Sequence, residues 1–274
     1  MDKSFLQSPA WGEVQTSYGR KIKWLGSTLA IQYPLPFQQH YWFIPQGDYV
    51  AGLADGAVFV RFEPQLTPTL GRKVNDVHPS HTLITPLLSP DIMLKNMKQK
   101  CRYNIHLAEK KDILIKSDTD SETFYNVLVK TSYKQSIRLH PKPYYETMYE
   151  VLKKHHMVKI YTAYYQDKPI ATGLFIYHGD TVTYLHGGSD YNYRSMMAPY
   201  LLHWQVMQAA YQDKFAYYDW FGIAPDNQLK HPFAGITRFK LGFGGEIISR
   251  PGTFEQPLRP LWYNAYSIMK HLWI

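Results

Sequence analysis

The feature that most constrains the fold is a set of three alternating strands in the middle of the chain. Residues 158–165, 170–177 and 181–187 alternate apolar and polar side chains, and short turns at 166–168 and 178–180 join them. A period of two predicts half-buried strands, and turns this short place consecutive strands side by side in opposite directions. The sequence therefore predicts an antiparallel meander, on which the flanking elements must pack.

The meander belongs to a longer series of helices and strands. The pattern predicts a strand at 113–116 and helices at about 122–136 and 143–155 before it, then a helix at 199–213 and a strand at 216–220. This order resembles an acyltransferase domain of the GNAT type, in which helices cover a mainly antiparallel sheet. We therefore expect an α+β fold with mixed, mainly antiparallel sheets flanked by helices.

The N-terminal part repeats a thinner version of this pattern. Ser8 and Pro9 predict the cap and first turn of a helix that ends at Gly19. The elements expected after it are strands at 21–25, 28–36, 40–45, 57–62 and 81–88, then one basic helix from Asp91 to about Lys111. The segment Gln46–Gly56 is too short for the helix that this fold would place there, so the first domain is expected to be pared down.

Two tandem GNAT-like domains follow from this repetition. We expect residues 1–118, together with a C-terminal helix within 257–274, to form the first domain, and residues 119–256 to form the second. No long helical arm is expected in the second domain.

Composition bounds the partners and the compartment. The chain has 274 residues, a net charge of +8 and one cysteine, Cys101. The moderately basic charge favours a polyanionic partner, although basic proteins without one are common. A lone cysteine excludes an internal disulfide and fits a reducing compartment. The start lacks the apolar core of a secretory signal, and no run of ~18 apolar residues exists, so we expect a cytoplasmic protein.

Acyl-CoA chemistry is disfavoured by the start of the helix after the meander. Acetyl-CoA enzymes of the GNAT fold hold the pyrophosphate there on backbone N–H groups, within the pattern Arg/Gln-x-x-Gly-x-Gly/Ala. Here Arg194 is present, but Met197 and Pro199 occupy the two glycine positions, and proline has no N–H to donate. We therefore expect no CoA and no other cofactor.

A lysine between aromatic residues near the C-terminus is the strongest candidate for catalysis. Lys240 follows Phe239, and Gly242, Gly244 and Gly245 come directly after it. Glycine permits positive φ and a close approach of the backbone, and a lysine in such a setting can stabilise a developing negative charge. A solvated lysine before an ordinary turn fits these residues equally well.

Metal and nucleophile chemistry have little support. The close histidine pairs are His78 with His81 and His155 with His156, and neither has a carboxylate or thiol at ligand spacing. No metal site is therefore expected. Cys101 lies within the basic helix, and we interpret it as a packing residue.

Several stretches together resemble the FemABX family of aminoacyl-tRNA-dependent transferases, which build peptidoglycan interpeptide bridges. The stretches, in family order, are Leu6–Gln15 with Gly19–Lys23, Arg61–Pro64, the basic segment Met97–Lys110, His186–Ser189, Ala198–Tyr200, Tyr218-Asp219 with Gly222-Ile223, and Phe239-Lys240 with Phe243–Gly245. Each stretch alone is weak, whereas their shared order and spacing make the resemblance specific.

The resemblance implies a reaction and its partners. An amino acid would move from an aminoacyl-tRNA ester to an amine of a peptidoglycan precursor, either UDP-MurNAc-pentapeptide or lipid II. The protein would act as a monomer without a cofactor. An ester is already activated, so such an enzyme mainly needs positioning, an electrostatic clamp and a proton acceptor.

The resemblance also assigns candidate catalytic residues. Lys240 matches the lysine that supports the charge at the attacked carbonyl, and the Phe239 backbone lies beside it. Glu63 corresponds to a candidate base, although the family has aspartate there and a structural carboxylate fits equally well. His186 stands where an aromatic hydroxyl is frequent, and a neutral histidine could replace its hydrogen bond or act as the base.

Substrate contacts are implied in the same way. Lys23 matches a lysine that contacts the precursor diphosphate, and Tyr144 matches a tyrosine that contacts the precursor. Arg138 or Lys142 would supply the cationic neighbour of that tyrosine.

The basic helix is the candidate surface for tRNA. Lys98, Lys100, Arg102 and Lys110 could contact phosphates, which would make binding fall steeply with salt; a solvated helix face is the alternative. The C-terminal run 261–274 could touch the inner membrane face if the acceptor carries a lipid, or it could pack on the first domain. Two other functions stay open: N-acyl transfer to another cell-surface amine, and tRNA binding without catalysis.

Overall fold

The computed structural model describes residues 4–53, 55–135, 139–225, 231 and 233–272. The chain divides into two compact units. Residues 81–248 form one, here called the central unit, and the segments before residue 81 and after residue 248 form the other, called the terminal unit.

This division corrects the predicted boundary between residues 118 and 119. Residues 81–118 belong to the central unit because β6 (His81–Pro86) pairs with β11 (Tyr217–Gly222), and β7 (Leu114–Ser117) pairs with β8 (Val158–Tyr165). The C-terminal helix α8 (Pro260–Leu272) groups with the N-terminal strands in the terminal unit.

The central unit is built on a seven-stranded sheet in the order β12-β6-β11-β10-β9-β8-β7. The predicted meander forms its centre as β8, β9 and β10, which pair antiparallel. The bounds not yet given are β9 (Lys168–His178), β10 (Thr181–Ser189) and β12 (Glu246–Ser249). One pair, β10 with β11, is parallel, and its ladder stops at Thr183 and Asp219 although β10 continues beside β9 to Ser189. The two parallel strands therefore part beyond that point.

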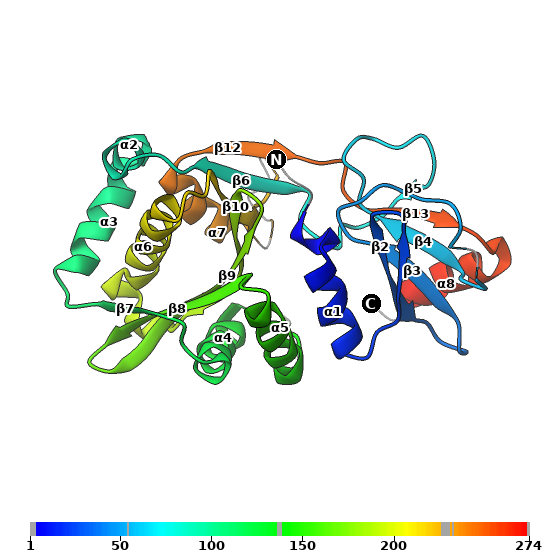
Figure 1. The fold of residues 1–274 in the computed structure, drawn as a ribbon, viewed down its shortest axis with the longest axis horizontal. Helices are drawn as coiled ribbons and strands as arrows, with labels where there is room; N and C mark the ends of the chain where they lie inside the picture. Colours follow the sequence, from blue (N-terminus) through cyan, green and yellow to red (C-terminus); the bar gives the residue numbers. More distant parts are fainter. Residues whose placement is uncertain (1–3, 54, 136–138, 226–230, 232, 273–274) are drawn as a thin grey trace. The chain divides into compact units, whose positions relative to one another are not determined.

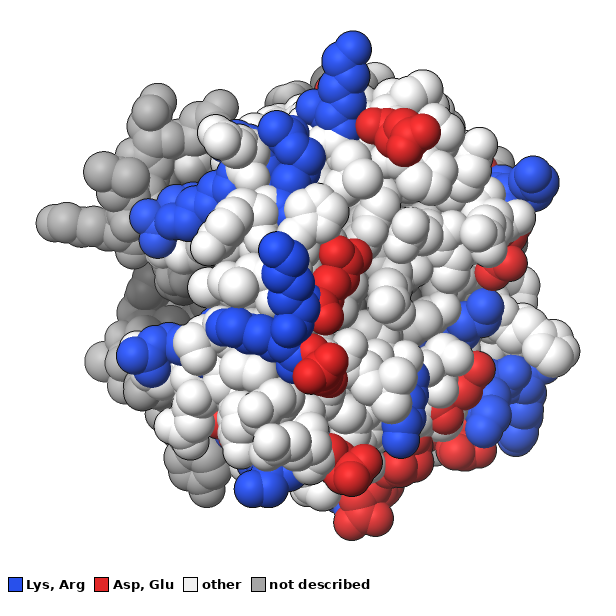
Figure 2. All heavy atoms as spheres, turned by 90° about the vertical axis from the view of Figure 1, so that its left-hand side faces the viewer, with Lys and Arg blue, Asp and Glu red and all other residues white. Residues whose placement is uncertain are grey.

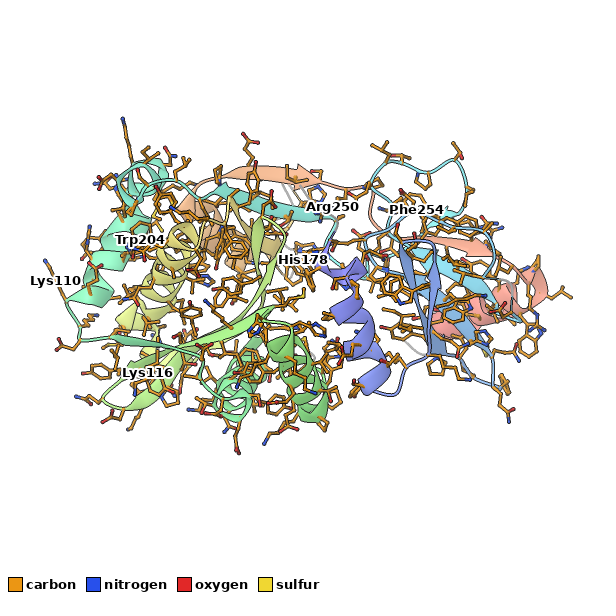
Figure 3. All side chains as sticks on the ribbon, viewed as in Figure 1. Lys110, Lys116, His178, Trp204, Arg250 and Phe254 are labelled. Atoms are coloured by element: carbon orange, nitrogen blue, oxygen red, sulfur yellow. The ribbon has the colours of Figure 1, made fainter. Side chains whose placement is uncertain are left out.

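Helices cover both faces of this sheet (Figure 1). Two helices, α4 (Ser121–Gln135) and α5 (Lys142–Lys154), lie on one face, and α6 (Ala198–Gln212) lies on the other with α3 (Gln99–Glu109) packed on it. The side chain of Trp204 on α6 lies on the side of α3 (Figure 3) and is buried in the same core as Cys101 and Ile105. Three short elements complete the unit: η2 (Tyr191–Met196), α7 (Ala234–Lys240) and η3 (Leu241–Phe243).

The single basic helix predicted from Asp91 to Lys111 is wrong. Two helices occupy this stretch, α2 (Pro90–Asn96) and α3, because Met97 and Lys98 adopt extended ψ angles of 151° and 145°. The break allows the Lys98 backbone N–H to donate to the carbonyl of Gly242, 2.9 Å away. The glycine segment after Lys240 therefore docks where the helix is interrupted.

The terminal unit contains a six-stranded sheet in the order β1-β2-β3-β4-β13-β5. Its elements are η1 (Phe5–Gln7), α1 (Pro9–Ser17), β1 (Ile22–Leu25), β2 (Thr28–Pro34), β3 (His40–Ile44), β4 (Phe59–Phe62), β5 (Arg72–Lys73), β13 (Phe254–Pro257) and α8. Its one parallel pair, β3 with β4, corresponds to β10 with β11 of the central unit. The predicted cap of α1 is confirmed, since Ser8 Oγ accepts from the Trp11 N–H at 3.2 Å.

The terminal unit is pared down as expected. Between β3 and β4 the described residues 45–53 and 55–58 contain no helix. The helix α8 covers one face of the sheet (Figure 1), where Tyr263 packs against Phe59 at a centroid distance of 5.5 Å. Packing is therefore confirmed for this part of the C-terminal run. Across the described residues, no helix has both the length and the apolar character needed to cross a membrane.

Candidate active site

The Phe239-Lys240 pair forms the last turn of α7 in the central unit. The glycines after it hold this turn in place: Gly244 and Gly245 have φ angles of +79° and +127°. A Cβ added at Gly245 would lie 2.4 Å from the carbonyl oxygen of Ile84 on β6. The glycines therefore serve a close approach of backbones, which fixes where α7 ends and where Lys240 projects.

The Lys240 side chain points into the protein, with 5% of its surface exposed. Its Nζ donates to the carbonyl oxygens of Trp220 at 2.6 Å and Gly222 at 2.7 Å. Both carbonyls lie on β11 beyond the end of its ladder with β10, so the lysine satisfies backbone acceptors where the strands part. Burial lowers the pKa of Lys240 to about 7, and the charge of Asp219 opposes this shift.

One aromatic ring lies directly against this lysine. Its Nζ lies 5.4 Å from the centre of the Tyr184 ring, and Tyr184 in turn packs edge-on against His203 at 4.4 Å. His203 is buried, its Nδ1 is 2.6 Å from the Tyr218 hydroxyl, and burial followed by the Lys240 charge holds its pKa well below the ordinary value. Sequence reasoning missed His203, because a lone histidine within an apolar helix gives no signal of its partner.

A pocket of about 120 Å³ opens beside Phe239. It lies at the start of α6, and its lining includes Asp190, Arg194, Met197 and Tyr200. The Phe239 ring packs edge-on against Tyr200, with centroids 4.8 Å apart. The structure therefore places the aromatic member of the predicted pair at a cavity and the lysine in the adjoining core.

The start of α6 cannot form the phosphate cradle of an acyl-CoA enzyme. Met197 adopts the left-handed conformation with φ of 56°, and its N–H donates to Arg194 at 3.4 Å. Pro199 has no N–H, and the N–H of Tyr200 donates to Met197 at 3.0 Å. The turn therefore uses the N–H groups of Met197 and Tyr200 within the chain itself, and Pro199 has none to offer.

Two predicted residues, His186 and Tyr144, meet in one aromatic cluster of the central unit. His186 lies on β10 and packs edge-on against Tyr145 at 5.2 Å, while the Tyr144 ring lies 4.4 Å from His140. The rings of His140 and His186 are 6.4 Å apart. The head of α5 and the middle of β10 therefore share a cluster of two histidines and two tyrosines.

Of the two cationic neighbours proposed for Tyr144, the structure describes only Lys142. Lys142 lies in the first turn of α5, with its Nζ 3.5 Å from Glu122 and 3.6 Å from Glu146. Arg138 lies outside the described residues.

Glu63 lies in the terminal unit and its carboxylate accepts four hydrogen bonds. The donors are the backbone N–H groups of Gln46 at 3.0 Å and His78 at 2.8 Å, the His78 ring at 2.7 Å and the Thr253 hydroxyl at 3.2 Å. Desolvation raises the pKa of Glu63, but His78 and the backbone donors outweigh it and lower the pKa overall. This bonding is typical of a structural carboxylate and makes Glu63 a weak base.

Lys23, the proposed diphosphate contact, is paired within the terminal unit. Its Nζ donates to Asp55 at 2.9 Å and to the carbonyl of Gly52 at 3.2 Å. Both side chains of the ion pair are partly exposed, so an anionic ligand could compete for the ammonium at small cost.

The four candidate tRNA contacts fall into two groups. Lys98, Lys100 and Lys110 are exposed, and the Lys110 side chain extends away from α3 (Figure 3). Arg102 instead turns back, because its Nη1 donates to the carbonyls of Leu94 at 3.2 Å and of Met97. Figure 2 shows the face of the central unit that carries α2 and α3, where basic side chains are spread out with acidic ones between them.

Cys101 and the histidines add no further chemistry. Cys101 is buried and burial raises its pKa to about 12, which confirms its interpretation as a packing residue. In the described part of the chain, no three His, Cys, Asp or Glu side chains lie close enough together to hold a metal ion.

Comparison with known sequences points to one family. The model of the FemAB family matches residues 83–167 and 159–271. Aminoacyltransferase FemA of Staphylococcus epidermidis is 31% identical over 104 residues, which are 38% of this chain and 25% of that protein. Aminoacyltransferase FemB of the same species is 26% identical over 103 residues, with the same shares. The match thus spans about a quarter of these curated relatives.

Comparison with solved structures confirms the predicted fold class. The crystal structure of FemX superposes with a TM-score of 0.79 at 15% identity, covering 96% of this chain and 94% of that one. The C-terminal domain of a putative lysylphosphatidylglycerol synthetase from Agrobacterium fabrum reaches 0.60 at 10% identity, covering 95% and 90%. A tandem GNAT protein from the clavulanic acid pathway reaches 0.51 at 11% identity, covering 86% and 81%. Two tandem GNAT-like domains therefore describe the fold.

The family match extends over well more than half of the chain and includes the meander, the start of α6 and the Phe239-Lys240 turn. Together with the fold, this match shows what the ordered motifs of the sequence predicted: the chain belongs to the FemAB family.

Proposed function

We propose that the protein is an aminoacyltransferase that moves an amino acid from aminoacyl-tRNA to an amine of a peptidoglycan precursor. The observation that carries this proposal is Lys240, a buried amine that donates to two backbone carbonyls and directly follows Phe239, which lines the pocket at the start of α6. Relatives named aminoacyltransferase support the reaction class.

The proposed chemistry needs one developing charge to be stabilised. The acceptor amine attacks the ester carbonyl carbon, a C–N bond forms, and negative charge collects on the carbonyl oxygen. The C–O bond to the terminal ribose then breaks, and the ribose oxygen leaves with the proton that the amine has given up. An ammonium has three donors, and Trp220 and Gly222 use two of those of Lys240. We assign the third to the carbonyl oxygen, where a fixed charge in an apolar site acts strongly.

The donor end is proposed to enter beside Phe239. The pocket at the start of α6 is lined by aromatic and aliphatic side chains with Asp190 and Arg194 among them, which suits a flat base with polar edges. Lys98, Lys100 and Lys110 would hold the tRNA backbone at a distance from the chemistry.

The acceptor is proposed to use the remaining predicted contacts. Tyr144 and His186 would bind the precursor through their aromatic cluster, with Lys142 beside them. Lys23, in the terminal unit, is proposed as a separate contact that would exchange Asp55 for a diphosphate. Glu63 would support its own unit instead of taking the proton, because its lone pairs are occupied.

The direct test is transfer of a labelled amino acid from charged tRNA to UDP-MurNAc-pentapeptide or lipid II by the purified protein. We expect Lys240→Ala to reduce transfer at least ~100-fold, in the range seen for loss of one transition-state donor. Lys159→Ala is the matched control, since this lysine pairs with Asp213 at the surface of the same unit. Transfer from acetyl-CoA but not from charged tRNA would overturn the proposal.

A further inference from the structure

The strand that holds Lys240 is distorted by one extra residue. The register of β11 against β6 runs from Asp219 opposite Ile84 to Gly222 opposite Thr82, so β11 contains a bulge. Phe221 lies within the bulge with φ of +55°, a conformation that is costly for a bulky side chain. Such strain persists only where the surrounding structure enforces it.

The Asp219 carboxylate closes this bulge. Its Oδ1 accepts from the backbone N–H of Phe221 at 2.8 Å and from the hydroxyl of Thr82 on β6. The two residues that flank Phe221 are Trp220 and Gly222, whose carbonyls hold the Lys240 ammonium. The carboxylate thus fixes the backbone whose carbonyls accept the hydrogen bonds of Lys240.

Asp219 also supplies charge to the same place. The groups that face Lys240 come from three elements: Tyr184 from β10, His203 from α6 and Asp219 from β11. His203 is neutral at physiological pH and the tyrosine offers only its ring. Of these three groups, the carboxylate is the one that favours the charged form of the lysine, against its burial.

We propose that Asp219 is a positioning residue for Lys240: its carboxylate closes the bulge whose two carbonyls hold the lysine amine, and it places a negative charge beside that amine. This inference rests on the proposed function of Lys240. Asp219 touches no reacting atom, so its removal should change the protonation and placement of the lysine and leave substrate affinity intact.

The first test is independent of activity. The side-chain signal of Lys240 in lysine-labelled protein is assigned by its absence from Lys240→Met and titrated by NMR. Asp219→Asn keeps the shape and one acceptor oxygen but removes the charge. We expect the midpoint to fall by about one pH unit, a ~tenfold change in the protonated fraction. Asp213→Asn, which removes a surface carboxylate of the same unit, should leave the midpoint unchanged. An unchanged midpoint in Asp219→Asn would overturn the inference.

The second test uses the pH profile of amino acid transfer. In Asp219→Asn the alkaline fall of kcat should move to lower pH by the same amount, with KM within ~twofold of wild type. A uniform loss of kcat at every pH, with no displacement of the profile, would count against positioning. If the wild-type protein transfers no amino acid, the proposed function fails, while the NMR titration still decides the role of Asp219.

Discussion

At the scale of single residues, Lys240 makes stability depend on pH. Its pKa of about 7 in the folded protein lies below the ordinary 10.5, so between these values the unfolded chain holds a proton that the folded protein lacks. The free energy of unfolding should therefore rise with pH from about 7 upward, by up to ~1.4 kcal/mol per pH unit, and stay flat below. Urea denaturation from pH 6 to 9 should show this rise in wild type relative to Lys240→Met. Parallel curves would contradict the lowered pKa of Lys240.

For Glu63 we predict a structural role: its substitution should reduce stability much more than activity. Because its carboxylate accepts four hydrogen bonds, Glu63→Gln should leave one or more buried donors unpaired and reduce the free energy of unfolding by about 1–3 kcal/mol. The transfer rate, corrected for the folded fraction, should remain within tenfold of wild type. A loss of more than ~100-fold in kcat with unchanged stability would restore Glu63 as the base.

The sequence singles out the candidate pair Phe239 and Lys240 but not the residues around it. Phe239 and Lys240 stand out because aromatics and glycines flank them within a short stretch. Their partners Tyr184, His203 and Asp219 are scattered over three elements, and only the parting of β10 and β11 brings them together. Contacts between residues that are far apart in the sequence produce no local sequence pattern.

At the scale of elements, the glycine segment after α7 should be intolerant of side chains. Gly245→Ala would place a Cβ 2.4 Å from the carbonyl of Ile84 at a φ of +127°, and we expect it to lower the free energy of unfolding by about 1–3 kcal/mol. Gly235→Ala is the control, since nothing lies within 4 Å of its added Cβ in α7. That variant should be neutral or more stable by up to ~1 kcal/mol. Thermal unfolding compares the two, and equal melting temperatures would refute the close approach.

The basic residues around α2 and α3 should have two different roles, tRNA binding for the exposed lysines and stability for Arg102. Replacing the exposed Lys98, Lys100 and Lys110 by alanine should weaken tRNA binding and reduce the salt slope of log K by about two to three. Arg102→Ala should mainly reduce stability, by about 1 kcal/mol, because its guanidinium donates to backbone carbonyls.

Filter binding at several salt concentrations measures both effects. The matched control replaces three exposed lysines elsewhere on the central unit, Lys116, Lys154 and Lys168. If the control changes the salt slope of log K as much as the Lys98, Lys100 and Lys110 variant does, tRNA binding depends only on net charge.

Helices and strands were predicted well where the spacing of apolar residues was regular. They were missed where contacts with distant parts of the chain determine the backbone. The meander and the helices on either side of it differ from their predicted bounds by a few residues at most. The break at Met97 and Lys98 was missed because the apolar spacing continues through it, and only the bond from Lys98 to Gly242 explains the interruption. The short helix α7 was missed for a similar reason, since its residues have little apolar periodicity.

At the scale of the whole molecule, the boundary between the units was the main error. The strand β6 is next to the terminal unit in sequence but pairs with β11, which is more than a hundred residues away, and no local signal records such a partner. The return of α8 was predicted because family resemblance, unlike periodicity, carries long-range topology.

The connectivity of the two units leads to a prediction about fragments. The central unit, residues 81–248, is continuous, whereas the terminal unit needs β13, which lies between β4 and β5, and α8. We expect the fragment 81–248 to fold alone and the fragment 1–80 to remain unfolded, because it lacks the strand that completes its sheet and the helix that buries Phe59. A short glycine linker from Ser80 to Ser249 should restore the terminal unit, since the Arg250 N–H already donates to the Ser80 carbonyl at 2.8 Å. Circular dichroism and amide dispersion in NMR spectra would read out each fragment. If the fragment 1–80 folds, or if the linked chain does not, the two units are not the independent folding units that we predict.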